Sequence, residues 1–137
     1  MTRVVAVVGP SGSGKTRLIT GLLPVFRAWG LKVGVVKHTH HRRLVVDRPG
    51  KDSWRHWRAG ASAVALVGPD VLAVSRRVRR LSLSDVVPRM GNGLDVILVE
   101  GFRAARVPKI RPPFPRTVAG VRLLASDIVR LMTEVGR

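Results

Sequence analysis

Eight consecutive residues near the N-terminus, GPSGSGKT at positions 9–16, place glycines, a lysine and a threonine at a spacing suited to phosphate chemistry. They fit the pattern G-x-x-x-x-G-K-[ST], the Walker A motif or P-loop, at every position. Its glycines let backbone N–H groups turn inward around a phosphate, Lys15 would reach the terminal phosphates, and the Thr16 hydroxyl would bind Mg²⁺. With the residue that follows the motif, the predicted nucleotide-binding residues are Gly9, Ser11, Gly12, Ser13, Gly14, Lys15, Thr16 and Arg17.

A nucleotide-bound Mg²⁺ also requires a nearby carboxylate, normally at the end of a neighbouring buried strand. Glu100 ends the apolar run DVILVE and is followed at once by Gly101. Ligands of open α/β sheets bind beyond the carboxyl ends of the strands, so Glu100 is predicted to hold or organise the metal. Asp95 begins the same run and should lie at the opposite edge of the sheet.

Residues 37–41, KHTHH, contain three of the four histidines of the chain. A zinc site, a phosphate contact and a solvated loop are all compatible with this composition. The absence of cysteine and of a His-x₃-His helix argues against zinc. If the loop emerges beside the phosphates, Lys37 and the imidazoles would meet phosphate, and Asp47 would meet Mg²⁺ or the attacking water. Lys15, Asp47 and Glu100 are therefore the predicted catalytic residues, and Thr16, Asp47 and Glu100 the predicted metal-site residues.

The elements that must position these residues alternate between apolar strands and helical stretches, which is typical of an α/β fold with a mostly parallel sheet flanked by helices. Residues 4–8, 33–37 and 95–100 read as buried strands, and residues 63–75 as a small hairpin around Gly-Pro-Asp. Helices are predicted at 16–29, 53–59 and 84–90. Pro24 would kink or shorten the first of them, and Gly30 would end it. The second would be capped by Ser53 and ended by Gly60. We expect a weak strand near 117–121, a last helix from about 126 and a Pro-rich linker at 108–115, all within a single domain, 1–137.

Composition narrows the possible partners. The chain has 25 Lys and Arg against eight Asp and Glu, a net charge of +17, and no cysteine. Such a charge suits a polyanion, but only three Phe, three Trp and no Tyr are available for base stacking, so a nucleic-acid partner is not expected. No apolar run approaches the ~18 residues of a membrane span. We expect a cytoplasmic protein without a membrane partner.

KHTHH, followed by D-R-PGKDSWRHWRAGA, then DVILVEGFR and PKI, resembles the MobB family of GTP-binding proteins of molybdopterin guanine dinucleotide biosynthesis. The resemblance implies a P-loop NTPase fold of the SIMIBI type, a homodimer, GTP and Mg²⁺ as ligands, and slow hydrolysis. It also implies molybdenum cofactor biosynthesis alongside a MobA-type guanylyltransferase that joins GMP to molybdopterin. The P-loop residues, Asp47 and Glu100 match family positions.

The chain departs from the family after PKI, where its segment is shorter and carries no N-K-x-D motif to read guanine. Asp127 could approach the base or simply start a helix. The preference for guanine therefore follows from the resemblance alone.

Residues 49–53, PGKDS, start a predicted helix, which needs no function, but they also bring basic residues toward the phosphate edge. We hypothesise an anionic cleft completed by a second subunit and lined by Lys37, His38, Lys51, Arg55 and Arg58. Two other functions stay open at this point. One is a small-molecule phosphotransferase, for which the RRVRR run at 76–80 would serve as a lid, and the other is a basic nucleic-acid-binding module.

Overall fold

The computed structural model describes residues 1–41, 44 and 48–134, with the side chains of residues 132–134 left undescribed. Contacts divide the chain into two compact units, Met1–Thr39 with Ser82–Arg137, and His40–Leu81. We describe the two units separately. Whether they form the predicted single domain stays a prediction.

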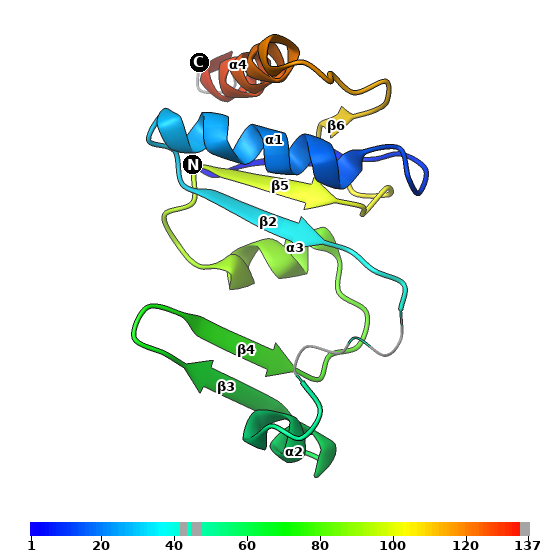
Figure 1. Ribbon diagram of the computed structural model, residues 1–137, viewed down its shortest axis with the longest axis vertical. Coiled ribbons are helices and arrows are strands. Elements are labelled where there is room, and N and C mark those ends of the chain that lie inside the picture. Colours follow the sequence, from blue (N-terminus) through cyan, green and yellow to red (C-terminus); the bar gives the residue numbers. More distant parts are fainter. Residues whose placement is uncertain (42–43, 45–47, 135–137) are drawn as a thin grey trace. The chain divides into compact units, whose positions relative to one another are not determined.

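The larger unit contains a sheet of four parallel strands in the order β2-β5-β1-β6 (Figure 1). These strands are β2 (Val33–Lys37), β5 (Val96–Glu100), β1 (Arg3–Val7) and β6 (Lys109–Ile110). The register aligns Val7, Glu100 and Lys37 in one row. The carboxyl ends of three neighbouring strands therefore meet at one edge of the sheet, as the sequence predicted.

Two faces of this sheet are covered, which explains why β1 and β5 are continuously apolar. Val5, Val7 and Leu98 pack in one core with helices α1 (Lys15–Ala28) and α4 (Val118–Glu134). The intervening residues, such as Ala6, Ile97 and Val99, pack in a second core with α3 (Leu83–Val86) and the 3₁₀ helix η1 (Val87–Met90). Figure 1 shows α1 and α4 on one side of the sheet and α3 on the other.

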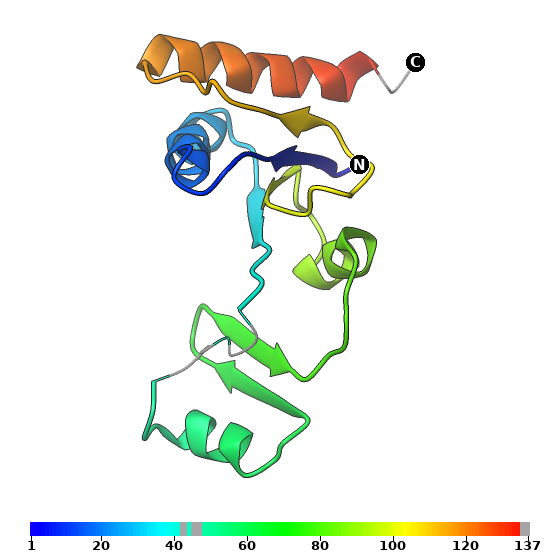
Figure 2. The same cartoon turned by 90° about the vertical axis from the view of Figure 1, so that its right-hand side faces the viewer.

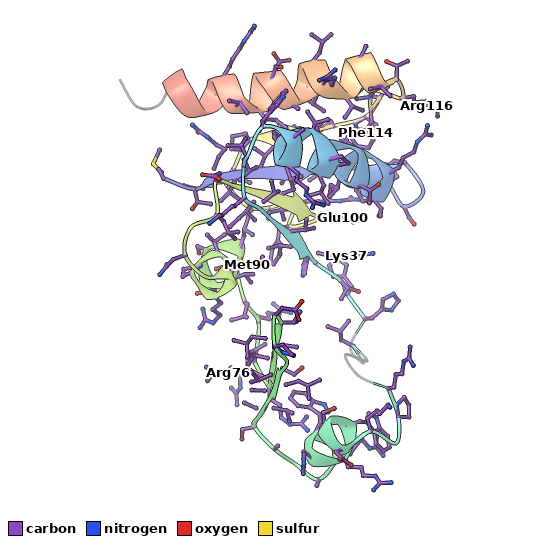
Figure 3. All side chains as sticks on the ribbon, turned by 60° about the vertical axis from the view of Figure 1, so that its left-hand side comes forward. Lys37, Arg76, Met90, Glu100, Phe114 and Arg116 are labelled. Atoms are coloured by element: carbon purple, nitrogen blue, oxygen red, sulfur yellow. The ribbon has the colours of Figure 1, made fainter. Side chains whose placement is uncertain are left out.

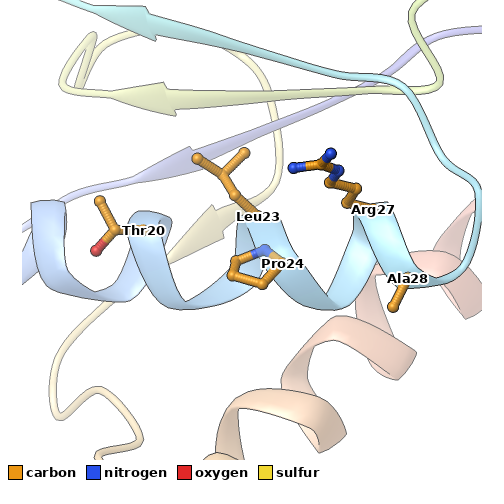
Figure 4. Close-up of a pocket in the computed structure, with 5 residues that line it drawn as sticks. All are labelled: Thr20, Leu23, Pro24, Arg27 and Ala28. Atoms are coloured by element: carbon orange, nitrogen blue, oxygen red, sulfur yellow. The ribbon is translucent and has the colours of Figure 1, made fainter.

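Helix α1 is fixed by an apolar stripe that includes Leu22 and Phe26, both fully buried. It begins after Gly14, which has a φ of 98°, and ends before Gly30, which has a φ of 73°, as expected of a helix stop. Pro24 does not shorten the helix. Figure 4 shows Pro24 on the outer face, where it lines an open hollow with Thr20, Leu23, Arg27 and Ala28.

Helix α3 starts with a capping box that the sequence did not predict. The Ser82 hydroxyl accepts a bond from the Asp85 backbone N–H at 3.3 Å, and the Ser82 N–H donates to Asp85 Oδ2 at 2.8 Å. The hydrogen bonds from Ser82 hold the pKa of the Asp85 carboxyl below its usual value. The predicted helix at 84–90 is confirmed as α3 followed by η1, one residue earlier at its start.

Three predictions on the C-terminal part of the chain are wrong. The last helix, expected from about 126, begins at Val118, so Asp127 lies inside it and does not start it. The expected strand at 117–121 is the first turn of α4, and the Thr117 hydroxyl accepts a bond from the Gly120 N–H at 3.0 Å at its start. Val121 packs with the α1 core, so burial at helical spacing decides the structure here. The expected linker at 108–115 contains strand β6, which pairs Ala6 with Lys109 and Val7 with Ile110.

The smaller unit contains helix α2 (Asp52–Arg58) and an antiparallel hairpin of β3 (Ala63–Val67) and β4 (Leu72–Arg76). The hairpin and the Gly60 stop, with a φ of 108°, agree with the sequence. The predicted Ser53 cap is wrong, because Lys51 is the N-cap residue and the cap has no side-chain hydrogen bond. Arg77, the residue after β4, connects the hairpin with α2. Its guanidinium lies 4.0 Å from the centroid of the Trp57 ring and donates to the Trp57 carbonyl at 2.6 Å.

No described residue of this smaller unit is buried, although the hairpin is rich in apolar side chains. Val67 is 76% exposed, Leu72 66% and Leu66 56%. A two-stranded hairpin is marginally stable on its own, and these exposed side chains leave it apolar surface to bury. Within the described residues, no helix has the length and apolar character needed to cross a membrane.

Candidate phosphate-binding site

The P-loop, residues 9–16, leads from the end of β1 into the first turn of α1, which is the context that the motif requires. Gly12 and Gly14 have φ of 75° and 98°, in the left-handed region that favours glycine. The Ser13 N–H donates to the Pro10 carbonyl at 3.2 Å. The remaining loop N–H groups and the N-terminus of a 14-residue helix provide an anion-binding end.

Two details mark the interior of the loop as a polar cradle. Within the described part of the chain, the Ser13 hydroxyl is buried and has no hydrogen-bond partner. A Cβ added at Gly9 would lie 2.8 Å from this oxygen. A buried hydroxyl without a partner is costly and calls for an acceptor or donor that the protein itself does not supply, such as a phosphate oxygen.

The Lys15 ammonium folds back over the loop. Its Nζ donates to the carbonyls of Gly9 and Pro10, each at 2.9 Å. Arg103, in the loop after β5, donates from Nη2 to the same Gly9 carbonyl at 2.9 Å. Two cationic side chains therefore converge on the carbonyl that opens the P-loop, where negative charge would be attracted.

Thr16 and Glu100, predicted from the sequence as partners at a metal, face each other. The Thr16 hydroxyl lies 3.1 Å from both Glu100 Oε1 and Oε2 and donates to this carboxylate. Glu100 is only partly buried at the end of β5, the strand next to β1. A hydroxyl and a carboxylate are the oxygen donors that Mg²⁺ prefers beside a phosphate, so these residues fit that ion.

The start of the histidine loop lies against the same edge. Lys37 aligns with Glu100 in the sheet, as Figure 3 shows, and the His38 N–H donates to the Glu100 carbonyl at 2.9 Å. The His38 ring stacks on Phe102 with centroids 4.1 Å apart. Phe102 has a φ of 53° and Gly101 a φ of 102°, so the turn after Glu100 is tight. His38 is thus engaged by the loop that carries Glu100. No group of three or more possible ligands for a metal occurs among the described His, Cys, Asp and Glu residues.

The remaining predicted metal-site and cleft residues lie outside the larger unit or outside the described residues. Asp47 lies outside the described residues. Lys51, Arg55 and Arg58 belong to the smaller unit, where the Arg58 guanidinium lies 5.5 Å from the Trp54 ring. The hypothesis of a cleft that joins them to Lys37 and His38 stays a prediction.

Figure 2 shows the segment that leads from β6 into α4. Sequence reasoning missed its contacts with the P-loop. The Pro112 ring lies 3.3 Å from where a Gly9 Cβ would be, and the Phe114 ring 3.9 Å from the same position at Gly14. Further on, Arg116 and Arg17 line one cavity of about 300 Å³ beside α1. Local sequence gives no signal for this position of the segment, because it follows from the pairing of Lys109–Ile110 with the strand that leads into the P-loop.

The parallel sheet, the helices on both of its faces and the loop between β1 and α1 define an α/β protein of the P-loop NTPase class. A family profile described as "Molybdopterin guanine dinucleotide synthesis protein B", MobB, matches residues 4–124. The chain belongs to the MobB family.

Individual relatives agree with the family match. Proteins named "Molybdopterin-guanine dinucleotide biosynthesis adapter protein" from Haemophilus influenzae and Escherichia coli are 39% and 38% identical over 109 and 114 residues. These matches cover 78% and 80% of this chain, but only 61% and 65% of the two relatives. The crystal structure of Bacillus subtilis MobB is similar with a TM-score of 0.69 at 33% identity, covering 83% of this chain and 69% of that one.

Proposed function

We propose that this protein binds GTP with Mg²⁺, hydrolyses it slowly, and acts in the cytoplasm as an adapter in molybdopterin guanine dinucleotide biosynthesis. The observation that carries the nucleotide part is the Thr16–Glu100 pair at the end of the P-loop, with both Glu100 oxygens 3.1 Å from the hydroxyl. Oxygen donors from the helix start and from the neighbouring strand meet beside the P-loop, where they would hold a nucleotide-bound Mg²⁺.

The biosynthetic part of the proposal rests on family membership and on the names of the relatives. Two relatives that share more than a third of their aligned residues with this chain are named adapter proteins of molybdopterin-guanine dinucleotide biosynthesis. The chain corresponds to less than two thirds of each, so their activity and partners are proposals for it. The partners we propose are a MobA-type guanylyltransferase and its molybdopterin substrate.

Each residue of the site has a role that follows from its chemistry. The P-loop N–H groups and the Ser13 hydroxyl would donate to phosphate oxygens, and Lys15 would exchange its bonds to two neutral carbonyls for bonds to negatively charged phosphate oxygens. Thr16 and Glu100 would hold Mg²⁺, which neutralises phosphate charge when bound. For Asp47, outside the described residues, we retain the role of positioning the metal or the attacking water.

Calorimetry with GTP, GDP and ATP, with and without Mg²⁺, tests the nucleotide part. We expect GTP to bind more tightly with Mg²⁺, and Lys15→Ala to weaken GTP binding because a charge-assisted contact is worth about 1.5–3 kcal/mol. Lys32→Ala is the matched control, because Lys32 is exposed at the opposite end of the sheet, before β2. Equal GTP affinities for the wild type and Lys15→Ala would refute this site.

We further propose that the protein is a homodimer in which the β3–β4 hairpin packs on a second copy. The exposed Leu66, Val67 and Leu72 give this hairpin an apolar surface that a second copy, carrying the same surface, would cover symmetrically. Leu72→Lys should shift the sedimentation coefficient from dimer to monomer without loss of GTP binding. A wild type that sediments as a monomer at micromolar concentration would exclude this part of the proposal.

A further inference from the structure

The loop after β5 brings a second functional group to the P-loop besides Glu100. Arg103 follows Glu100 by three residues, and its Nη2 donates to the Gly9 carbonyl at 2.9 Å. The same oxygen accepts from Lys15 Nζ at 2.9 Å. A single neutral carbonyl is thus shared by an ammonium and a guanidinium.

This shared carbonyl is a weak partner for Arg103. A guanidinium has five donors in a planar fork, suited to bidentate contacts with phosphate. The residue is exposed, so its bond to one neutral oxygen competes with water and adds little to the stability of the fold. A phosphate in the loop would offer several negatively charged acceptors next to the carbonyl where the guanidinium already lies, and these match its planar fork of donors.

The turn that carries Arg103 is held from several sides. The Gly101 N–H donates to the Val7 carbonyl at 3.3 Å, at the end of the strand that leads into the P-loop. Phe102 is stacked on His38, and a Cβ at Gly101 would come within 3.0 Å of His38 Cβ. The backbone between Glu100 and Arg103 is therefore tied to β1 and to the end of β2. From this backbone, the Glu100 carboxylate contacts Thr16 and the Arg103 guanidinium contacts Gly9, so both side chains reach the P-loop.

We propose that Arg103 is a catalytic residue for nucleoside triphosphate hydrolysis, contacting the γ-phosphate as it transfers; this inference rests on the proposed function. In the reaction, an oxygen of water forms a bond to the γ-phosphorus while the bond to the bridging oxygen breaks. The bonding electron pair remains on the β-phosphate of the diphosphate. One hydrogen of the water stays on the attacking oxygen and the other passes to an oxygen of the transferred phosphoryl group, so both leave with inorganic phosphate. Arg103 stays protonated and donates to the oxygens that gain negative charge, so its contribution is greatest in the transition state.

The test compares the wild type with Arg103→Ala, Arg103→Lys and Arg106→Ala. Arg106 is an exposed arginine three residues further along, so its variant makes the same change in charge away from the Gly9 carbonyl. Single-turnover GTP hydrolysis gives the rate. Calorimetry gives the affinities for GDP alone and for GDP with Mg²⁺ and aluminium fluoride, which imitates the transferring phosphoryl group.

We expect Arg103→Ala to lower the single-turnover rate by about 10²–10³-fold, the usual effect of losing one transition-state donor. It should also lose most of the extra affinity that aluminium fluoride gives to GDP, while affinity for GDP alone changes by less than about 3-fold, since GDP lacks the γ-phosphate that Arg103 contacts. Arg103→Lys should restore part of both effects, and Arg106→Ala should match the wild type.

Three results would overturn the inference: unchanged turnover and aluminium fluoride affinity in Arg103→Ala, an equal loss of GDP and analogue affinity, or the same losses in Arg106→Ala. The second would assign Arg103 to maintaining the shape of the P-loop. A wild type that binds no GTP would instead reject the proposed function, and this outcome is read from the wild type alone.

Discussion

Replacing glycine by alanine is expected to have opposite effects on stability at Gly9 and at Gly21. Neither residue has a positive φ, so an alanine meets no backbone strain at either site. At Gly9, the new Cβ would lie 2.8 Å from Ser13 Oγ and 3.3 Å from Cδ of Pro112. At Gly21, inside α1, it would lie 3.7 Å and 3.9 Å from the two methyl groups of Val121 on α4, which is ordinary van der Waals contact.

The expected changes in GTP affinity and in stability depend on which side chains must move to make room for the new methyl group. In Gly9→Ala, the Ser13 side chain yields more readily than the Pro112 ring, and its hydroxyl leaves the interior of the loop. Losing one hydrogen bond to a charged phosphate costs about 1.5–3 kcal/mol, equivalent to roughly a 10- to 150-fold weaker Kd for GTP. Overpacking adds about 1–3 kcal/mol of lost stability. In Gly21→Ala, helix propensity contributes about 0.8–1 kcal/mol of added stability.

Thermal unfolding and GTP calorimetry on both variants test this reasoning. Gly21→Ala should raise Tm by roughly 3–5 °C and leave GTP affinity unchanged, while Gly9→Ala should lower both. A Gly9→Ala protein that binds GTP like the wild type would refute the polar cradle around Ser13. A lower Tm for Gly21→Ala would contradict the packing of α4 on α1.

Two further predictions concern the metal site and helix α3. Glu100→Gln keeps an acceptor for the Thr16 hydroxyl, now 3.1 Å from the carboxylate, but removes the negative charge. The Mg²⁺-dependent part of GTP affinity should therefore fall, while Mg²⁺-free GDP binding is retained. Calorimetry over a Mg²⁺ titration measures this, and an unchanged Mg²⁺ dependence would contradict a metal role. Because its folded-state pKa is lowered, Asp85 contributes stability above its unfolded pKa and loses it as the pH falls. Asp85→Asn should therefore unfold at a lower temperature than the wild type at pH 7, with the difference shrinking below about pH 4; a difference independent of pH would show that the charge is irrelevant.

The parts of the site that could be predicted from sequence are those encoded locally. The P-loop, its flanking strand and helix, and Glu100 at the end of an apolar run each carry their signal within a short window. The edge of the sheet at which they meet follows from parallel pairing alone, and Asp95 lies at the other edge as expected, accepting from the Lys32 N–H at 2.7 Å.

What could not be predicted depends on contacts between distant segments. Strand β6 has two residues, too few for any periodicity, and exists because it pairs with β1 about a hundred residues earlier. Val118 and Val121 favour a strand locally, but the packing of Val121 against the α1 core selects a helix. Arg103 ends the segment DVILVEGFR, a pattern that gives the arginine no role by itself, and its contact with Gly9 comes from the structure.

The proline-rich segment beside the P-loop has a consequence for the timing of nucleotide capture. Pro112, Pro113 and Pro115 have fixed φ, and Phe114 between them packs against the α1 core. A segment made of such residues has little conformational entropy left to lose when a ligand binds beside it. Nucleotide association should then proceed without waiting for this segment to order. Substitutions along it should act mainly through the lifetime of the complex, as dissociation rates, and leave the rate of encounter nearly constant.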